Sequence, residues 1–148
     1  MDKTLSFILT VIIVITLGIL SVLYFAFGDH KELDRLKNPV NNEEIYLIKV
    51  SWGLEDYRMA ISLNRKLKGG FSNNFDDKYL LDYGDHIFYK FSNDTLLIYG
   101  SEFDKPKVNN FMTPIKFITL ENPEFIRLGE NGHYKKYGLN IFPESVLE

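Results

Sequence analysis

The residue types that support acid–base or metal chemistry occur together in one short stretch, Asp82-Tyr83-Gly84-Asp85-His86. Two carboxylates and an imidazole this close together could ligate a divalent metal or transfer protons. However, the spacing matches no established set of metal ligands, and no second histidine lies nearby in the sequence. Asp and Gly also favour turns. We therefore expect a structural turn with an exposed His86, and we retain Asp82, Asp85 and His86 as the metal or acid–base candidates.

Other catalytic signatures are missing from the sequence. The chain has no cysteine, which excludes disulfides, thiolate zinc sites, iron–sulfur clusters and cysteine nucleophiles. No serine lies in a Gly-x-Ser-x-Gly elbow, and Gly69-Gly70 lacks the spacing of a phosphate-binding loop. The acidic pairs Glu55-Asp56 and Asp76-Asp77 are typical of solvated loops. The sequence therefore assigns no catalytic residue, predicts no cofactor and favours a non-enzymatic role.

A second group of residues is suited to contacts with a partner. Three basic residues between positions 65 and 68 could meet an anionic surface or an acidic protein. The loop 69–75 carries two aromatic residues, and exposed rings often mark contact surfaces. The simpler alternatives are a solvated hairpin tip and rings that fold back over the core. The candidate partner-binding residues are Trp52, Arg65, Lys66, Lys68, Phe71 and Phe75.

The N-terminal segment 4–28 contains no charged side chain. As a helix it would span roughly 37 Å, which exceeds the hydrocarbon core of a bilayer, about 30 Å. We therefore expect residues 1–28 to form a transmembrane anchor that contacts lipid from Leu5 to Phe27. A cleaved signal peptide is the alternative, because Ala26-Phe27-Gly28 resembles a cleavage site, although signal-peptide cores are usually about 7–15 residues long.

The charges that flank this segment do not settle its orientation. Lys31, Arg35 and Lys37 follow the segment, whereas Lys3 alone precedes it, and the positive-inside rule then favours a cytoplasmic C-terminal domain. The short N-terminal tail and the near-match to a cleavage site favour export instead. We expect an extracytoplasmic domain and leave the cytoplasmic alternative open.

The next segment, residues 29–42, is expected to continue the helix outside the membrane and then form a linker. Glu32 and Arg35 have the spacing of a helical ion pair, and two leucines give the segment a narrow apolar edge. Asn38-Pro39 should end this helix, because the residue before proline is pushed out of the helical region.

From residue 43 to 148 the hydrophobic pattern is that of a β domain rich in aromatic residues. Segment 56–64 alternates most clearly, and Ser92-Asn93-Asp94 has the composition of a hairpin turn. The sequence therefore predicts a mainly β fold, built as a small antiparallel sandwich or curved sheet, with a partly open barrel as the alternative. The predicted strands are 44–51, 56–64, 78–83, 85–91, 95–99, 115–120 and 124–128, with 133–139 as a helical turn or a strand.

Charge and composition limit the function. Lys plus Arg is 17 and Asp plus Glu is 20, and the resulting net charge of -3 argues against a general nucleic-acid binder. We expect a membrane-tethered β-rich module of the cell envelope that binds a protein partner or acts as an accessory subunit. The alternatives are an envelope enzyme that uses carboxylates and His86, and a β-barrel that binds a small ligand.

Overall fold

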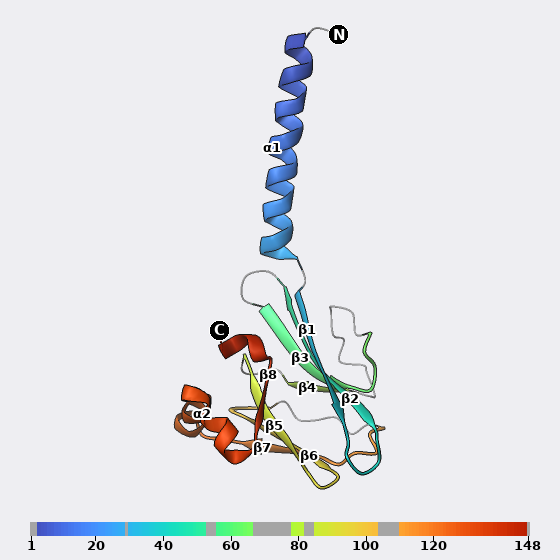
Figure 1. The fold of residues 1–148 in the computed structure, drawn as a ribbon, viewed down its shortest axis with the longest axis vertical. Coiled ribbons are helices and arrows are strands. Elements are labelled where there is room, and N and C mark those ends of the chain that lie inside the picture. The colour runs from blue at the N-terminus through green and yellow to red at the C-terminus, as the bar shows by residue number, and fades with distance from the viewer. Residues whose placement is uncertain are drawn as a thin grey trace.

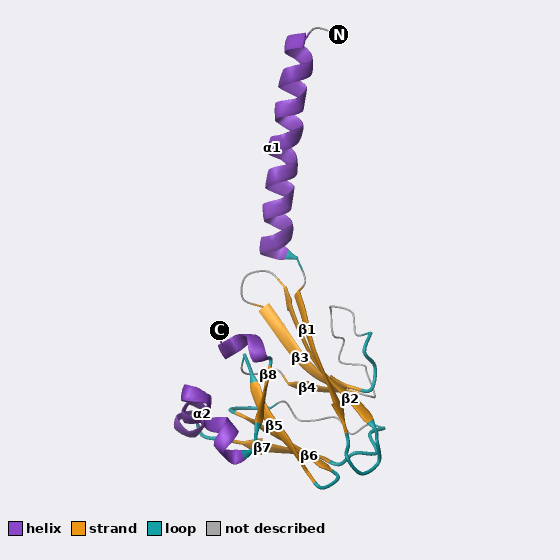
Figure 2. Ribbon diagram, viewed as in Figure 1, coloured by secondary structure: helices purple, strands orange, loops and turns teal. Residues whose placement is uncertain are grey.

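The computed structural model describes residues 3–28, 30–52, 56–66, 78–81, 85–103 and 110–147. A long helix, α1 (Lys3–Phe27), projects from a body of strands and short helices (Figures 1 and 2). The side chains of residues 7–24 are exposed on every side of this helix. The expected N-terminal apolar helix is therefore confirmed, and it is long and apolar enough to cross a membrane.

The described part of the body contains eight strands and three short helices. They form two sheets, with strand orders β1-β2-β3-β4 and β7-β6-β5-β8, which do not close into a barrel. The elements are β1 (His30–Lys37), β2 (Glu44–Trp52), β3 (Asp56–Ser62), β4 (Lys78–Leu81), β5 (Ile87–Ser92), β6 (Thr95–Gly100), β7 (Ile115–Thr119), α2 (Asn122–Gly129), the 3-10 helix η1 (Glu130–Tyr137), β8 (Asn140–Phe142) and the 3-10 helix η2 (Glu144–Leu147).

The two sheets share one buried core. Ile45 and Ile61 of the first sheet belong to the same apolar cluster as Ile87 and Ile98 of the second. Strand β2 is apolar on both faces, and its Ile48 lies in a separate buried cluster on the side away from the shared core. This position between β1 and β3 confirms that β2 is a central strand, as its apolar residues on both parities indicate.

The expected helix after the anchor is wrong, because this segment forms β1. All of its residues pair with β2, from His30 opposite Ser51 to Lys37 opposite Glu44. The pairing satisfies the backbone N–H and C=O groups that face β2 and buries Leu36 in the shared core. The first sheet therefore begins at β1. Of the predicted helix and linker, only the turn between β1 and β2 lies outside a strand.

The strand predicted at 124–128 is also wrong, because these residues form α2. A proline lies in its first turn, with Glu124 there and Arg127 in the last turn, which suits both ends of a helix. Phe125 is buried, whereas Ile126 beside it is 60% exposed. Segment 133–139 begins within η1, so the helical alternative holds for most of it.

One strand pair departs from the expected antiparallel arrangement. Strand β7 runs parallel to β6, with Leu96 opposite Ile115. A parallel neighbour requires a crossover of about a dozen residues or more. The segment 101–114 between these strands is long enough to return the chain to the start of β6. By contrast, β5 and β6 form the predicted antiparallel hairpin, with Asn93 at a φ of 55° in its turn.

A buried polar junction joins the turn after β1 to the second sheet. Asn38 is fully buried and donates from Nδ2 to the Asp94 carbonyl at 2.7 Å and to Thr113 Oγ1 at 2.8 Å. The Glu43 carboxylate accepts the backbone N–H groups of Met112 and Thr113 at 2.9 Å and 2.7 Å. Each of these buried polar side chains therefore has partners on a segment distant in sequence.

Candidate functional site

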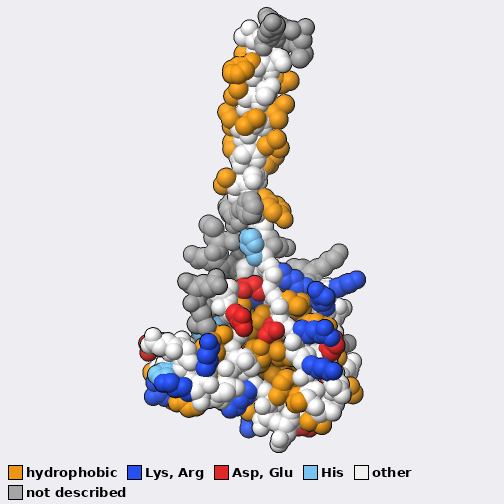
Figure 3. All heavy atoms as spheres, viewed as in Figure 1, with side chains coloured by type: hydrophobic (Ala, Val, Ile, Leu, Met, Phe, Trp, Pro, Cys, Tyr) orange, Lys and Arg blue, Asp and Glu red, His pale blue; other side chains and the backbone are white. Residues whose placement is uncertain are grey.

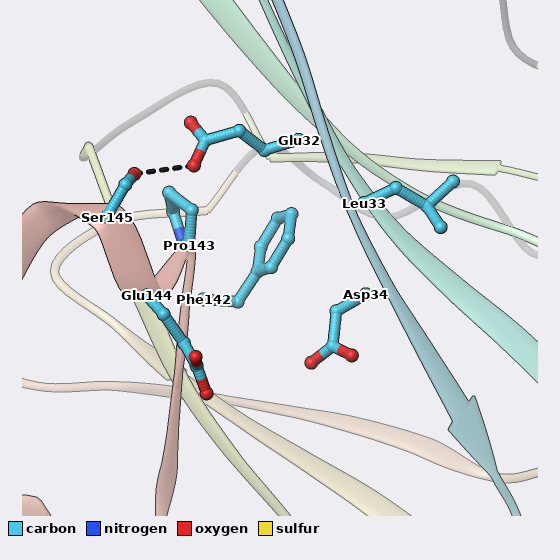
Figure 4. A pocket seen from close by; sticks show the side chains of 7 residues that line it. All are labelled: Glu32, Leu33, Asp34, Phe142, Pro143, Glu144 and Ser145. Carbon is cyan, nitrogen blue, oxygen red and sulfur yellow. Dashed lines mark hydrogen bonds between the residues drawn. The ribbon is translucent and has the colours of Figure 1, made fainter.

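A pocket of about 290 Å³ lies between β1 and the C-terminal segment (Figure 4). Strand β1 is at one edge of the first sheet and β8 is at one edge of the second, so the pocket opens where both sheets end. Three of its lining side chains are carboxylates, and Phe142 lies between them in the view. The lining residues are Glu32, Leu33, Asp34, Phe142, Pro143, Glu144 and Ser145. We call this space the acidic pocket.

Strand alternation places the first two carboxylates in the acidic pocket. Glu32 and Asp34 lie on the same face of β1 as Leu36, which is in the shared core. Ser145 Oγ donates a hydrogen bond to Glu32 Oε2 at 2.5 Å, and the Tyr89 hydroxyl donates to Asp34 Oδ2 at 2.5 Å. Both carboxylates thus connect β1 to elements that follow much later in the chain.

The neighbouring Tyr89 has a raised pKa. Burial raises the pKa of the Tyr89 hydroxyl, and its hydrogen bond to Asp34 and the negative charges of Asp34 and Glu144 raise it further. A neutral hydroxyl therefore remains as a donor to Asp34 at physiological pH. The carboxylate acceptors that line the acidic pocket suit cationic or hydrogen-bond-donating groups of a ligand.

A buried lysine lies close to the same end of the body. Lys49 is directly opposite Glu32 in the β1–β2 ladder and is 8% exposed. Its ammonium group donates to the Asp85 carbonyl at 2.9 Å and lies 4.9 Å from the centre of the Tyr57 ring. The lysine is thus held by the protein's own groups on the inner side of β2.

The opposite face of β1 is basic. Lys31, Arg35 and Lys37 alternate with the inward-facing acidic residues and are exposed. Arg35 forms an ion pair with Glu44, whose carboxylate also accepts a hydrogen bond from Tyr46. Figure 3 shows acidic side chains gathered below α1 and basic side chains beside them on the same view of the body. We call the side chains of Lys31, Arg35 and Lys37 the basic row.

Lys31 also connects the basic row to one of the predicted contact residues. Its Nζ donates to the Arg65 carbonyl at 2.8 Å. Partial burial lowers the pKa of Lys31, and the nearby positive charge of Arg65 lowers it further. Arg65 and Lys66 are exposed, as expected for that pair. Trp52 ends β2, whereas Lys68, Phe71 and Phe75 lie outside the described residues.

The predicted Asp–His candidates are only partly in the described residues. Asp82 lies outside them, while His86 Nδ1 is 2.6 Å from Asp85 Oδ1. The expectation of an exposed His86 is wrong, because its side chain is only 15% exposed. It stacks on Phe125 with 4.6 Å between ring centres and meets the edge of Phe88 at 5.2 Å.

This arrangement uses His86 as a packing group between β5 and α2. Its Nε2 atom is buried and has no hydrogen-bond partner in the described structure. A general acid or base needs hydrogen-bond access to its substrate, and the buried ring atom offers none here. Among the described residues, no group of three His, Asp or Glu side chains is placed to hold a metal ion.

Sequence reasoning did not identify the acidic pocket. Its two sides are far apart in the chain, as the 113-residue separation between Glu32 and Ser145 shows. The alternation of Glu32, Asp34 and Leu36 was the available signal, and reading that segment as a helix concealed it. No protein-family model, curated protein or solved structure matches this chain.

Proposed function

We propose that the protein is a membrane-tethered binding module, with α1 as an uncleaved anchor and the acidic pocket as its binding site. In this proposal the two sheets form a sandwich whose open edge, between β1 and β8, receives a protein partner. The single observation that carries it is the direct succession of α1 and β1. The strand that lines the pocket begins at His30, three residues after the helix ends at Phe27.

The polar groups of α1 support the anchor. The hydroxyls of Thr10 and Thr16 donate to the carbonyls of Ser6 and Ile12, at 2.9 Å and 2.8 Å. These two hydroxyls are then satisfied within the helix, as a hydrocarbon environment requires. The exposed apolar side chains of residues 7–24 would otherwise face water on all sides.

Tethering explains how a shallow site can be sufficient. A module held at the bilayer meets other membrane or envelope proteins at a raised effective concentration, so a modest affinity of the site gives useful occupancy. The acidic pocket favours a cationic segment of such a partner, because Glu32, Asp34 and Glu144 surround it. We further propose that the β domain lies outside the cytoplasm.

The anchor and its orientation are tested together. The intact mass of the protein recovered from alkali-washed membranes should include α1, whereas a product that begins near residue 29 would show a cleaved signal peptide. An alkaline phosphatase fusion after Glu148 should be active. A stable but inactive fusion would place the β domain in the cytoplasm.

The binding site is tested by site-specific photocrosslinking in cells. A photoreactive residue at Ser145, which lines the acidic pocket and is exposed, should give a discrete covalent adduct with a protein. The same residue at Lys116, exposed on β7, is the matched control and should not give that adduct. Combining the probe at Ser145 with Glu32→Gln, Asp34→Asn and Glu144→Gln should remove the adduct. Identical adducts at both positions would contradict a binding role for the acidic pocket.

A further inference from the structure

Strand β1 has one edge without a strand partner among the described residues. It is the first strand of the order β1-β2-β3-β4 and pairs with β2 along its full length of 8 residues. We call the side of β1 that faces away from β2 its free edge. Such an edge presents backbone N–H and C=O groups on which another strand can be added.

The register identifies the backbone groups at this free edge. The Asn38 N–H donates to the Glu43 carbonyl at 2.9 Å, immediately beyond the pair of Lys37 and Glu44. Hydrogen-bonded and non-bonded pairs alternate along an antiparallel ladder. The backbone groups of Lys37, Arg35 and Leu33 are therefore directed away from β2. Each supplies an N–H donor and a C=O acceptor to the free edge.

The side chains beside the free edge are sorted by charge. On the outer face of β1 they are the basic row, Lys31, Arg35 and Lys37. On the inner face they are Glu32 and Asp34, which line the acidic pocket. An added strand would therefore have cations along one of its faces and carboxylates along the other.

This charge pattern disfavours a second copy of β1 as the added strand. In an antiparallel pair, residues opposite one another lie on the same face of the sheet. A two-fold pair centred on Leu33 would place Lys31 opposite Arg35 and Glu32 opposite Asp34. Centring on Asp34 would place Lys31 opposite Lys37 and the two Asp34 side chains together. Both registers bring like charges together, which is destabilising in a cross-strand pair.

We propose that the free edge of β1 binds an extended segment of a partner protein by antiparallel strand addition, with acidic side chains toward the basic row and basic side chains toward the acidic pocket. This inference rests on the proposed binding function and names the chemistry of the segment. Main-chain hydrogen bonds would supply affinity, and the alternating charges would supply specificity and fix the register. The acidic pocket gives the basic side chains room on the inner face (Figure 4).

A synthetic peptide provides the direct test. Acetyl-Glu-Val-Glu-Lys-Val-Lys-Glu-amide, paired antiparallel, places its glutamates opposite the basic row and its lysines opposite Asp34 and Glu32. Titrated into the full chain in detergent micelles, it should shift the backbone amide NMR signals of Leu33, Arg35 and Lys37. The charge-reversed peptide, with Glu and Lys exchanged, should bind at least about tenfold more weakly at low salt.

Two N-methylated peptides separate strand addition from charge attraction alone. Methyl groups on the third and fifth residues remove the amide donors that face β1, while methyl groups on the fourth and sixth leave those donors intact. The first peptide should bind at least about tenfold more weakly than the parent, because it loses two hydrogen bonds that each contribute modestly. The second should retain binding, although both carry the same charges.

The outcomes are decisive for the inference and distinguishable from failure of the proposed function. Absence of parent-peptide binding at peptide concentrations up to about 1 mM would overturn strand addition. Equal binding of the two methylated peptides would do the same, and so would equal binding of the charge-reversed peptide. In each case a photocrosslinked adduct at Ser145 could still form and would leave the broader binding role standing.

Discussion

The hydroxyl of Tyr89 donates a hydrogen bond to Asp34 Oδ2 at 2.5 Å. Tyr89 lies on β5 of one sheet and Asp34 on β1 of the other, so this bond crosses between the sheets. It also lies beside the acidic pocket, to which Asp34 contributes its carboxylate. The bond therefore couples the stability of the β domain to the state of the proposed binding site.

The first prediction concerns alkaline pH. The folded-state pKa of Tyr89 is raised from its ordinary value of 10.0 by burial, and next by the hydrogen bond to Asp34. The resulting stabilisation is complete below pH 10 and declines as the pH rises, because tyrosine ionises first in the unfolded chain. Tyr89 alone should lower the free energy of unfolding by at most about 1.4 kcal/mol per pH unit above pH 10.

Chemical unfolding of the full chain in detergent, followed by circular dichroism between pH 8 and pH 11, checks this prediction. Tyr89→Phe should reduce the decline of stability above pH 10. Tyr137→Phe changes a tyrosine that is 60% exposed and serves as the matched control. A Tyr89→Phe variant whose stability declines as steeply as that of the unchanged protein would contradict the role given to this hydroxyl.

The second prediction concerns the buried junction at Asn38. The side chain is 0% exposed and bridges the Asp94 carbonyl and Thr113 Oγ1. Asn38→Leu removes both hydrogen bonds that Nδ2 donates and the acceptor Oδ1 of the Val40 N–H, which should lower the free energy of unfolding by about 2–4 kcal/mol. Asn140→Ala, at an exposed position of β8, should change it by less than about 0.5 kcal/mol. A loss for Asn38→Leu as small as that expected of the control would contradict the role of the junction in stability.

Several parts of the fold could be read from the sequence because their signals are local. The alternation that contains Met59 and Ile61 predicted β3, and Ser92-Asn93-Asp94 predicted the hairpin between β5 and β6. Strand β1 could not be read in this way. Glu32 and Arg35 suit a helix by their spacing, and only pairing with β2, a non-local interaction, decides for the strand.

The candidate site could not be predicted from the sequence for the same reason. Asp85 and His86 are neighbours in the sequence, so the sequence indicates them as candidates. It does not indicate that Phe125, in a segment predicted as a strand, lies in a helix and stacks on the His86 ring. The acidic pocket depends on bringing Glu32 next to Ser145, and no local pattern records a contact across that distance.

The third prediction tests the packing of α2. Phe125 is 8% exposed and lies against His86 and Phe88, whereas Ile126 is 60% exposed. Phe125→Ala should lower the free energy of unfolding by about 3–5 kcal/mol, because it opens a cavity in the aromatic cluster. Ile126→Ala, a neighbouring truncation, should cost less than about 0.5 kcal/mol. Denaturant titrations of the two variants make the comparison, and a larger loss at Ile126 would contradict the position of α2.

The last prediction concerns the ion pair beside the free edge of β1. The pKa of Glu44 is lowered most by its hydrogen bond with Arg35 and next by its hydrogen bond with Tyr46. The carboxylate is therefore stabilised in its charged form, and this contribution is present above its unfolded pKa and lost as the pH falls through the folded value. In NMR titrations of the full chain, Arg35→Gln should raise the pKa of Glu44 more than Tyr46→Phe does. The reverse order would mean that Tyr46 holds the carboxylate, leaving Arg35 available to a partner strand.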